Sequence, residues 1–419
     1  MTSAPLFDLI VFGATSFVGR LLCAELLAQF GLAGPLRWAA AGRSAPRLEA
    51  LRRDLGPAAA GLACLVADAA DEASLQGLCR RTRLVVSTVG PYALHGERLV
   101  KVCAAIGTDY CDLSGEVQWI RRMIERHEPA ARASGARIVH CCGFDSIPSD
   151  LGVLFLQQQA LERLGAPCRR VAMRLRALRG GVSGGTAASL LNVVREAAAD
   201  PALRRELADP YSLCPPAPPG ASRVRQPRLG GARYDPDCGA WIAPFVMGAI
   251  NTRVVLRSHA LLGEPWGAGF TYEEAVLTGR GLRGHLGALG MSTGLAGFML
   301  AGAFAPTRWM LERWVLPAPG AGPDAEARRT GYFDLRFFGT TADGRALRVK
   351  VTGDRDPGYG STAKMLSQAA ASLALDHGAT RGGGGGFWTP ASLLGMRLIE
   401  RLRAHAGLAF EVLREKPET

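Results

Sequence analysis

Lysine is nearly absent from this chain, which leaves arginine to carry almost all of the positive charge. The formal net charge is +12, and lysine occurs only at Lys101, Lys350, Lys364 and Lys416. The arginines are spread along the sequence and are not clustered with aromatic residues, which argues against nucleic acid as a partner. Guanidinium groups suit acidic partners instead, such as a phosphorylated cofactor, an acyl carrier protein or an anionic membrane surface. Codon bias alone would give the same composition.

The sequence also lacks a secretory signal and any C-x-x-C pair among its 10 cysteines. Cysteines such as Cys23 and Cys103 lie in apolar stretches, where a thiol behaves as a small buried hydrophobe. We therefore expect a reduced, cytoplasmic protein without a metal site, with peripheral membrane contact left open. The adjacent pair Cys141-Cys142 stays open as a redox or metal alternative. A length of 419 residues predicts two or three structural units.

The chain begins with an apolar run at residues 8–12 that leads into a glycine-bounded turn and then a helix-like segment at 20–30. A strand, a tight turn and a helix N-terminus offer free backbone N–H groups to a dinucleotide pyrophosphate. Serine occupies the position where the usual spacing has its middle glycine, so the fingerprint is imperfect. The predicted phosphate-binding residues are Gly13, Ala14, Thr15, Ser16, Phe17, Val18 and Gly19.

The end of the second predicted strand, at residues 36–41, decides which dinucleotide is bound. A carboxylate there would bind the ribose 2′-hydroxyl of NAD, whereas arginine accommodates the 2′-phosphate of NADP. No acidic residue occurs between Gly31 and Leu48, and the strand runs into Arg43 and Ser44. Both side chains donate hydrogen bonds that suit a phosphate. NADP(H) is therefore the predicted cofactor, and a solvated arginine is the alternative.

Strands and helices continue to alternate up to about residue 145. Further strands are predicted at 63–67, 83–89, 110–113 and 136–141, separated by helices at 74–80, 96–106 and 116–134. This spacing predicts parallel pairing in an α/β, Rossmann-type doubly wound sheet, with the ligand at the carboxyl ends of the strands. The residues at these strand ends that we expect to contact the cofactor are Asp68, Thr88, Val89, Gly90 and Pro91.

The regular alternation of strands and helices ends at about residue 150. Strands are predicted at 169–178, 249–258, 332–340 and 346–352, a helix at 186–206 and a long loop at 215–237. This part is expected to be an inserted α+β domain, with an antiparallel sheet and helices on one face. The closing segment predicts a helix at 389–406, beginning with Thr389 and Pro390, and a short strand at 410–413.

One segment, residues 286–305, carries no charge over its whole length. That length could cross a bilayer, but the segment holds several glycines, and the sequence contains no second segment of this kind. Small residues at Gly290, Gly294 and Gly297 would allow close helix packing. The alternatives are a buried or dimer-interface helix, a helix that docks to a membrane or lines an acyl pocket, and a true membrane span.

Six blocks along the chain together resemble the saccharopine dehydrogenase-like oxidoreductases, and within them the bacterial trans-acting enoyl reductases of lipid and polyketide synthesis. The blocks are GATSFVG at 13–19, STVGPYALHGERLVKVCAAIGTDYCDLSGE at 87–116, GFDSIPSDLG at 143–152, SGGTAAS at 183–189, GDRDPGYGSTAKM at 353–365 and GGFWTPASLLG at 385–395. The resemblance covers about residues 6–413 and is more specific for the family than for the substrate. It implies an NADP-binding Rossmann domain at 1–150, an inserted domain at 151–385 and a C-terminal helix within 386–419 that returns to the first domain.

Candidate proton donors follow the predicted strands, at the edge of the sheet that should face the nicotinamide. Tyr92 and His95 follow the fourth strand, and either could protonate an enolate, although each also suits a packing role. Asp112 and Asp145 end the fifth and sixth strands, and for Asp145 or its neighbour a helix N-cap is the alternative.

From the inserted domain, Tyr359 and Lys364 are candidates to reach across the cleft. The residues predicted to be catalytic are Tyr92, Asp145 and Tyr359.

These features predict an NADPH-dependent enoyl reductase that acts on a lipidic or polyketide acyl substrate, free or carrier-bound, and assembles as a homodimer. One alternative is a saccharopine-type amino-acid dehydrogenase, whose substrate carboxylates would need arginines at the cleft. Another is a non-catalytic NADP-binding protein at a membrane or lipid surface.

Overall fold

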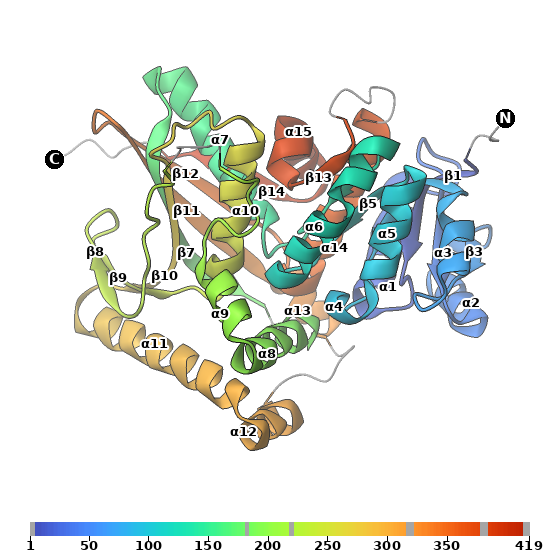
Figure 1. The fold of residues 1–419 in the computed structure, drawn as a ribbon, viewed down its shortest axis with the longest axis horizontal. Helices are drawn as coiled ribbons and strands as arrows, with labels where there is room; N and C mark the ends of the chain where they lie inside the picture. Colours follow the sequence, from blue (N-terminus) through green and yellow to red (C-terminus); the bar gives the residue numbers. More distant parts are fainter. Residues whose placement is uncertain (1–4, 181–183, 218–221, 316–321, 378–383, 414–419) are drawn as a thin grey trace.

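The computed structural model describes residues 5–180, 184–217, 222–315, 322–377 and 384–413. Within them the chain forms two seven-stranded sheets with helices packed around each (Figure 1). Apolar residues from one face of the first sheet, such as Leu9 and Val11, belong to the same buried cluster as Phe337 and Val349 of the second sheet. One hydrophobic core therefore connects the two sheets.

The first sheet is entirely parallel, with the order β13-β6-β5-β4-β1-β2-β3. This is the Rossmann order, so the predicted α/β doubly wound fold is confirmed. A seventh strand arrives from far along the chain and was not predicted. The strands are β1 (Phe7–Phe12), β2 (Trp38–Gly42), β3 (Ala63–Val66), β4 (Thr82–Ser87), β5 (Asp109–Asp112), β6 (Arg137–Val139) and β13 (Gly386–Trp388).

Both faces of this sheet are covered because alternate residues of a strand point to opposite sides. Leu9 and Val11 lie in one core cluster, while Ile10 and Phe12 lie in another. The helices on the first face are α1 (Phe17–Phe30), α2 (Ala45–Asp54) and α14 (Thr362–Ala371). Those on the second face are α3 (Glu72–Cys79), α5 (Glu97–Ile106) and α6 (Val117–Ser134), and the short helices η1 (Pro57–Ala59) and α4 (Tyr92–His95) lie in the connections.

The second sheet has the order β14-β12-β11-β7-β10-β9-β8, and only its β7–β10 pair is parallel. The expectation of a largely antiparallel sheet is therefore confirmed. Helix α7 (Ile147–Leu164) packs against four of its strands. The strands are β7 (Cys168–Arg179), β8 (Arg233–Asp235), β9 (Ala240–Pro244), β10 (Thr271–Gly279), β11 (Tyr332–Thr341), β12 (Ala346–Gly353) and β14 (Leu408–Val412).

The predicted strand at 249–258 is wrong, because this segment lies in helix α10 (Gly248–Leu261). The alternation of polar and apolar residues suggested a strand with one exposed face, but the polar residues of this segment are buried together with the apolar ones. Arg253 donates to the carbonyl oxygens of Ala249 and Leu207, and Arg257 donates to that of Phe387. A helix buried on most sides shows no amphipathic period to recognise.

The predicted helix at 186–206 is divided into α8 (Gly184–Ala199) and α9 (Pro201–Ala208). Asp200 separates them and caps the second helix, since its carboxylate accepts a hydrogen bond from the Ala202 N–H at 2.7 Å.

The closing helix begins later than predicted. Residues 386–388 form β13, a π-helical turn η5 (Pro390–Leu394) follows, and α15 (Gly395–His405) comes next. Thr389 does cap this start, because its hydroxyl accepts from the Ser392 N–H at 3.2 Å.

The uncharged segment 286–305 lies mostly in helix α11 (Gly281–Ala303), along the lower edge of the molecule in Figure 1. The reading as a plain core helix is wrong, because only Gly284, Ala288 and Gly302 of this helix are buried. By length and composition α11 is the one described helix that could cross a membrane. Short helices follow it, namely α12 (Ala305–Met310), η2 (Leu311–Val315), α13 (Ala325–Thr330), η3 (Pro357–Ser361) and η4 (Ser372–Asp376).

Candidate active site

The turn after β1 has the tight geometry that its two glycines predict. Gly13 has φ +87°, a conformation that favours glycine, and a Cβ there would lie 2.7 Å from Val89 Cγ2. A Cβ on Gly19 would lie 2.2 Å from the Gly13 carbonyl oxygen. Larger side chains would therefore push helix α1 away from β1 and open the turn.

Ser16, which replaces the middle glycine, acts as the N-cap of α1. Its Oγ accepts from the Gly19 N–H at 3.0 Å and lies 3.0 Å from Thr88 Oγ1. Thr88 in turn donates to the Gly13 carbonyl oxygen at 2.9 Å, which ties the turn to the end of β4. The backbone N–H groups of Thr15, Phe17 and Val18 have no acceptor among the described residues. These free donors at a helix N-terminus fit a pyrophosphate.

Arg43 lies just beyond β2 and is exposed. It forms no hydrogen bond or ion pair with any residue that the structure describes. The neighbouring strand end approaches the turn, since a Cβ on Gly42 would lie 3.7 Å from Thr15 Oγ1. Ser44 precedes α2 without a capping hydrogen bond from its side chain. Both side chains are therefore available to a phosphate beside the turn.

Asp68 follows β3 and is exposed. Its carboxylate accepts from the Ala70 N–H at 2.9 Å, so it shapes the loop at the strand end. Its contact with cofactor remains a prediction.

Tyr92 follows Gly90 and Pro91 at the carboxyl end of β4, but its hydroxyl is engaged. The hydroxyl donates to the Ser87 carbonyl oxygen at 3.0 Å, and the ring lies 5.4 Å from that of Trp119. Burial raises the pKa of this phenol well above its usual value, and the side chain is only 5% exposed. His95, at the other end of α4, is exposed. The hydroxyl of Tyr92 is thus committed to holding the strand end.

Sequence reasoning missed Glu116, which organises this edge. Its fully buried carboxylate accepts from the N–H groups of Tyr92 at 2.8 Å and Ala93 at 3.0 Å, and so caps α4. It also accepts from Ser189 Oγ of α8 at 3.0 Å, which joins α8 to the edge of the first sheet. An acid at the first residue of a predicted helix was the available signal.

Asp112, expected to face the crevice, is fully buried. It lies 2.8 Å from His140 Nδ1 and accepts from the Tyr110 hydroxyl at 2.9 Å. Cys141, which follows His140 directly and lies just beyond β6, adopts φ +64° and donates its N–H to Asp112. A non-glycine residue in this region is strained, and strain of this kind gathers at functional sites.

Asp145 differs from these buried acids because it has no partner. The residue is partly exposed, and its carboxyl forms no hydrogen bond or ion pair with any described residue. The N-cap position of α7 belongs to Ser146, so the capping alternative for Asp145 does not hold. Desolvation raises the pKa of Asp145 from 3.8 to about 6. Near neutral pH this side chain can therefore hold or release a proton.

The block around Tyr359 packs against the phosphate turn. The Tyr359 ring meets Phe17 edge-on, with ring centroids 4.6 Å apart. Buried Asp356 fixes this turn by accepting from the N–H groups of Gly358 and Gly360. Lys364 does not extend into a cleft, because its ammonium pairs with Asp354 at 3.2 Å. The structure thus brings Tyr359 to the cofactor turn.

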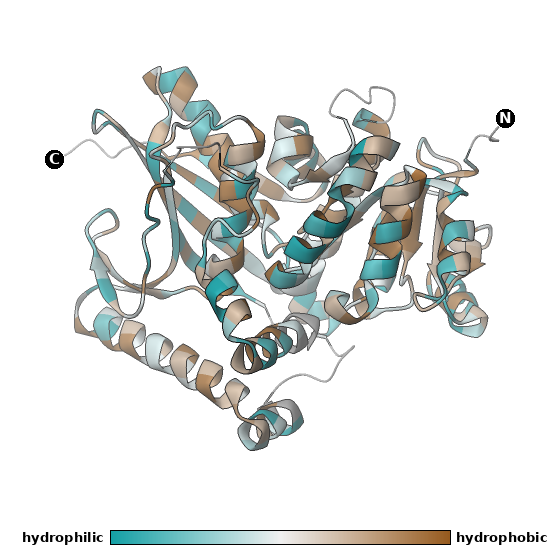
Figure 2. Cartoon of the chain, viewed as in Figure 1, coloured by the Kyte–Doolittle hydropathy of each residue, from teal (hydrophilic) through white to brown (hydrophobic). Residues whose placement is uncertain are grey.

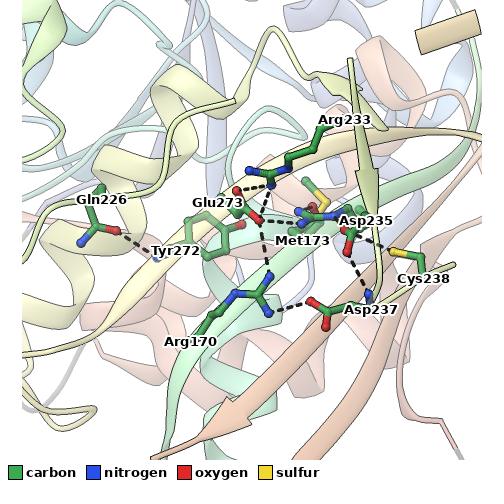
Figure 3. Close-up of polar contacts among 10 residues, drawn as sticks. Arg170, Met173, Gln226, Arg233, Asp235, Asp237, Cys238, Tyr272 and Glu273 are labelled. Atoms are coloured by element: carbon green, nitrogen blue, oxygen red, sulfur yellow. Dashed lines mark hydrogen bonds and ion pairs between the residues drawn. The ribbon is translucent and has the colours of Figure 1, made fainter. Parts of the chain in front are cut away.

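The second sheet contains a cluster of arginines, and acids surround it. Arg174 is fully buried and pairs with Asp235 at 2.5 Å and Glu273 at 2.7 Å. Figure 3 shows Arg233 and Arg170 on either side of Glu273, with Arg170 also paired to Asp237. Burial alone would raise the pKa of Glu273, but its pairing with Arg174 and Arg233 together outweighs burial and lowers that pKa. The cluster is electrically balanced.

Comparisons with known proteins agree with this geometry. Residues 9–139 match the family model described as the saccharopine dehydrogenase NADP binding domain, which confirms NADP(H) as the cofactor. A Mycobacterium tuberculosis protein that carries the name of a trans-acting enoyl reductase is 41% identical over 428 residues, which cover 99% of both chains. The trans-acting enoyl reductase of Mycobacterium bovis is 36% identical over 94% of this chain and 95% of its own.

Among solved structures, apo saccharopine dehydrogenase (L-Glu forming) from Saccharomyces cerevisiae matches with a TM-score of 0.56. That match covers 97% of this chain and 100% of the other at 15% identity, so it shows a shared fold. The likenesses extend over both sheets.

Proposed function

This chain belongs to the trans-acting enoyl reductase family of saccharopine dehydrogenase-like proteins, and from that premise we propose that it reduces the C=C bond of an α,β-unsaturated acyl thioester or ketone. NADPH held beside the turn after β1 would supply a hydride for the β-carbon of the substrate. A proton must then reach the α-carbon, because the hydride leaves an enolate there. The protein's own part is to hold both molecules at the carboxyl edge of the first sheet and to deliver that proton.

We assign proton delivery to Asp145. The observation that carries the proposal is that this carboxyl has no partner among the described residues and has a raised pKa. Asp145 follows β6, at the edge where ligands bind in this fold, and its pKa of about 6 keeps part of the population protonated near neutral pH. Its lack of a protein partner leaves the carboxyl group available to substrate. The carboxylate formed by proton transfer regains its proton from solvent before the next turnover.

Tyr92 and Tyr359 fit supporting roles in this proposal. The Tyr92 hydroxyl already donates to Ser87, and the Tyr359 ring covers Phe17 in the phosphate turn. Arg43 and Ser44 would hold the 2′-phosphate, and the free N–H groups of the turn would hold the pyrophosphate.

A lipidic acyl substrate fits better than an amino acid. A saccharopine-type substrate carries several carboxylates and would need unpaired arginines. The arginines gathered around Arg174 are already neutralised by Asp235, Asp237 and Glu273. The buried Arg253 and Arg257 of α10 already donate to backbone carbonyl oxygens.

The test is turnover of NADPH, followed by its absorbance, with two substrate classes. Enoyl thioesters of coenzyme A and of an acyl carrier protein are one class, and glutamate-type amino acids paired with 2-oxo acids are the other. We expect oxidation of NADPH with the enoyl thioesters only. Turnover with the amino-acid set, or with neither set while NADPH still binds, would contradict the proposal.

A further inference from the structure

Helices α11 and α12 and the turn after them present an apolar surface, which we call the apolar platform. Its members are large, and each has more than half of its surface exposed: Leu282, Leu286, Leu300, Phe304, Trp309 and Trp314. Figure 2 shows this strip as a largely hydrophobic helix at the rim of the molecule. Single exposed apolar residues are common, but a continuous strip of this size marks an interaction surface.

The platform is held in place by the fold behind it. Helix α11 packs on β9 and β10, where the rings of His285 and Trp241 stack 4.1 Å apart. Near its other end, Gly302 meets α8 so closely that a Cβ would lie 3.1 Å from Val194 Cγ1. Contacts at both ends keep the helix along the protein surface, which is the orientation of an interfacial helix and not of a membrane span.

Charge points to the kind of partner. No aspartate or glutamate occurs from Ala275 to Leu311, and Glu312 is the single acid of the strip, whereas two arginines stand at each of its ends. Arg280 and Arg283 precede the apolar residues, and Arg308 and Arg313 accompany the tryptophans. Apolar side chains flanked by arginine and tryptophan match the layering of a bilayer, with acyl chains below and anionic headgroups around them.

The same charges argue against a second copy of this chain as the partner. In a two-fold contact the helix would face itself in the opposite direction. Arg280 and Arg283 of one copy would then approach Arg308 and Arg313 of the other, and Glu312 is the single acid that each copy places among these four arginines. Like charges placed opposite each other weaken such an interface.

We propose that the apolar platform docks on an anionic lipid bilayer. Docking would also orient the active site, because α8 contacts the platform through Val194 and the first sheet through Ser189, whose hydroxyl donates to Glu116. The surface that touches lipid is thus connected by one helix to the edge that holds the cofactor. The docking itself does not depend on the enoyl reductase proposal, since it is measured as binding.

The test is flotation of the full chain with vesicles of phosphatidylcholine, alone or mixed with phosphatidylglycerol. We expect the protein to float with the mixed vesicles and to bind the neutral ones far more weakly. Leu286→Glu and Leu300→Glu should each weaken binding at least about tenfold. Each change removes a leucine side chain that would be buried in the bilayer on docking, and each adds a negative charge. Leu161→Glu, an equally drastic change at an exposed leucine of α7, is the matched control and should float like the native protein.

Charge is tested separately. Replacing Arg280 and Arg283 by glutamine should weaken binding to the mixed vesicles by about fivefold for each arginine and leave the weak binding to neutral vesicles unchanged. Thermal unfolding of each variant checks that the fold is intact.

Three results would overturn the proposal. The first is equal flotation of native protein and Leu286→Glu. The second is a concentration-dependent dimer, seen by light scattering without vesicles, that Leu286→Glu abolishes, which would make the platform a contact between copies. The third is resistance to alkaline carbonate extraction, which would indicate a membrane span.

Discussion

Asp145 and Glu273 are both carboxylates that the fold holds away from bulk water, yet their surroundings are opposite. Glu273, in the second sheet, is met by Arg174 at 2.7 Å and Arg233 at 2.9 Å, and its pKa lies below the usual value. Asp145, at the edge of the first sheet, meets no cation among the described residues, and its pKa rises to about 6. Burying a charge without a partner costs free energy, so the ionised form of Asp145 lowers the stability of the folded protein.

The two regions therefore use charge for different purposes. Around Glu273 the charged side chains form ion pairs that link strands β7, β8 and β10 of the second sheet. Around the cofactor edge, Arg43 and Asp145 are left without partners, which keeps their hydrogen-bonding capacity for ligands. Perturbed, unpaired groups at strand ends are the ones that favour chemistry.

The largest expected effect is on catalysis. Asp145→Asn should lower kcat by about 10²- to 10⁴-fold, because an amide cannot supply the proton, while the Kd for NADPH stays unchanged. In the native enzyme, kcat should fall as the pH rises through about 6, since only the protonated carboxyl donates. Initial rates and cofactor titrations measure both. A normal kcat in this variant would transfer the donor role to solvent or to another residue.

The same variant should be more stable than the native protein above pH 6. A raised carboxyl pKa means that stability present below about pH 4 is lost as the pH rises through about 6. The asparagine has no such loss, and its advantage at pH 8 should reach at most about 3 kcal/mol. Urea unfolding at pH 4 and pH 8 measures the difference, which should vanish at the lower pH. A variant that is less stable at both pH values would show that Asp145 is structural.

A substitution in the ion-pair cluster around Arg174 should lower the stability of the protein, in contrast to Asp145→Asn. Arg174→Met should cost about 3–5 kcal/mol of unfolding free energy, because it leaves Asp235 and Glu273 buried with less compensation. NADPH binding should not change in the folded protein. Arg176→Met, two residues along the same strand and 61% exposed, is the matched control and should cost less than about 1 kcal/mol. Equal losses for the two variants would contradict the distinction drawn between the regions.

Next in size is the cofactor preference. Arg43→Ala should weaken NADPH binding by about 1.5–3 kcal/mol, the range for a hydrogen bond to a charged group, and leave NADH binding nearly unchanged. Arg53→Ala, at the far end of α2, serves as control. Calorimetry with both cofactors measures the effect. An equal loss of affinity for both would remove Arg43 from the 2′-phosphate site.

The smallest effect is expected at Tyr92. Tyr92→Phe should cost about 1 kcal/mol of stability, through loss of the hydrogen bond to Ser87, with kcat close to the native value. Steady-state rates and thermal unfolding measure this. A fall in kcat of about 10²-fold would instead return the proton-donor role to Tyr92.

The first sheet was predictable because its strands are short apolar runs between glycines and acids, and the turn at Gly13 has a fixed spacing. Helix α10 was not, because Arg253 and Arg257 are buried through bonds to carbonyl groups distant in sequence. Strand β13 was missed for a similar reason: three residues carry no period, and only their pairing with β6 makes them a strand.

At the candidate site, the sequence indicated Arg43 and Asp145 from their places after strands. It could not show that Asp145 lacks a partner or that the Tyr92 hydroxyl has one, since both facts depend on groups brought together by folding. Glu116 was overlooked because its partner Ser189 lies in another part of the chain.

The last described residues have a consequence for synthesis. Strand β13 pairs with β6 of the first sheet, and β14 pairs with β12 of the second. Asp150 joins them to the body of the protein by accepting from the Ala391 N–H at 2.8 Å. Neither sheet can therefore acquire its full set of strands until residues 386–412 have left the ribosome, and truncation before them would leave β6 and β12 each without one neighbouring strand.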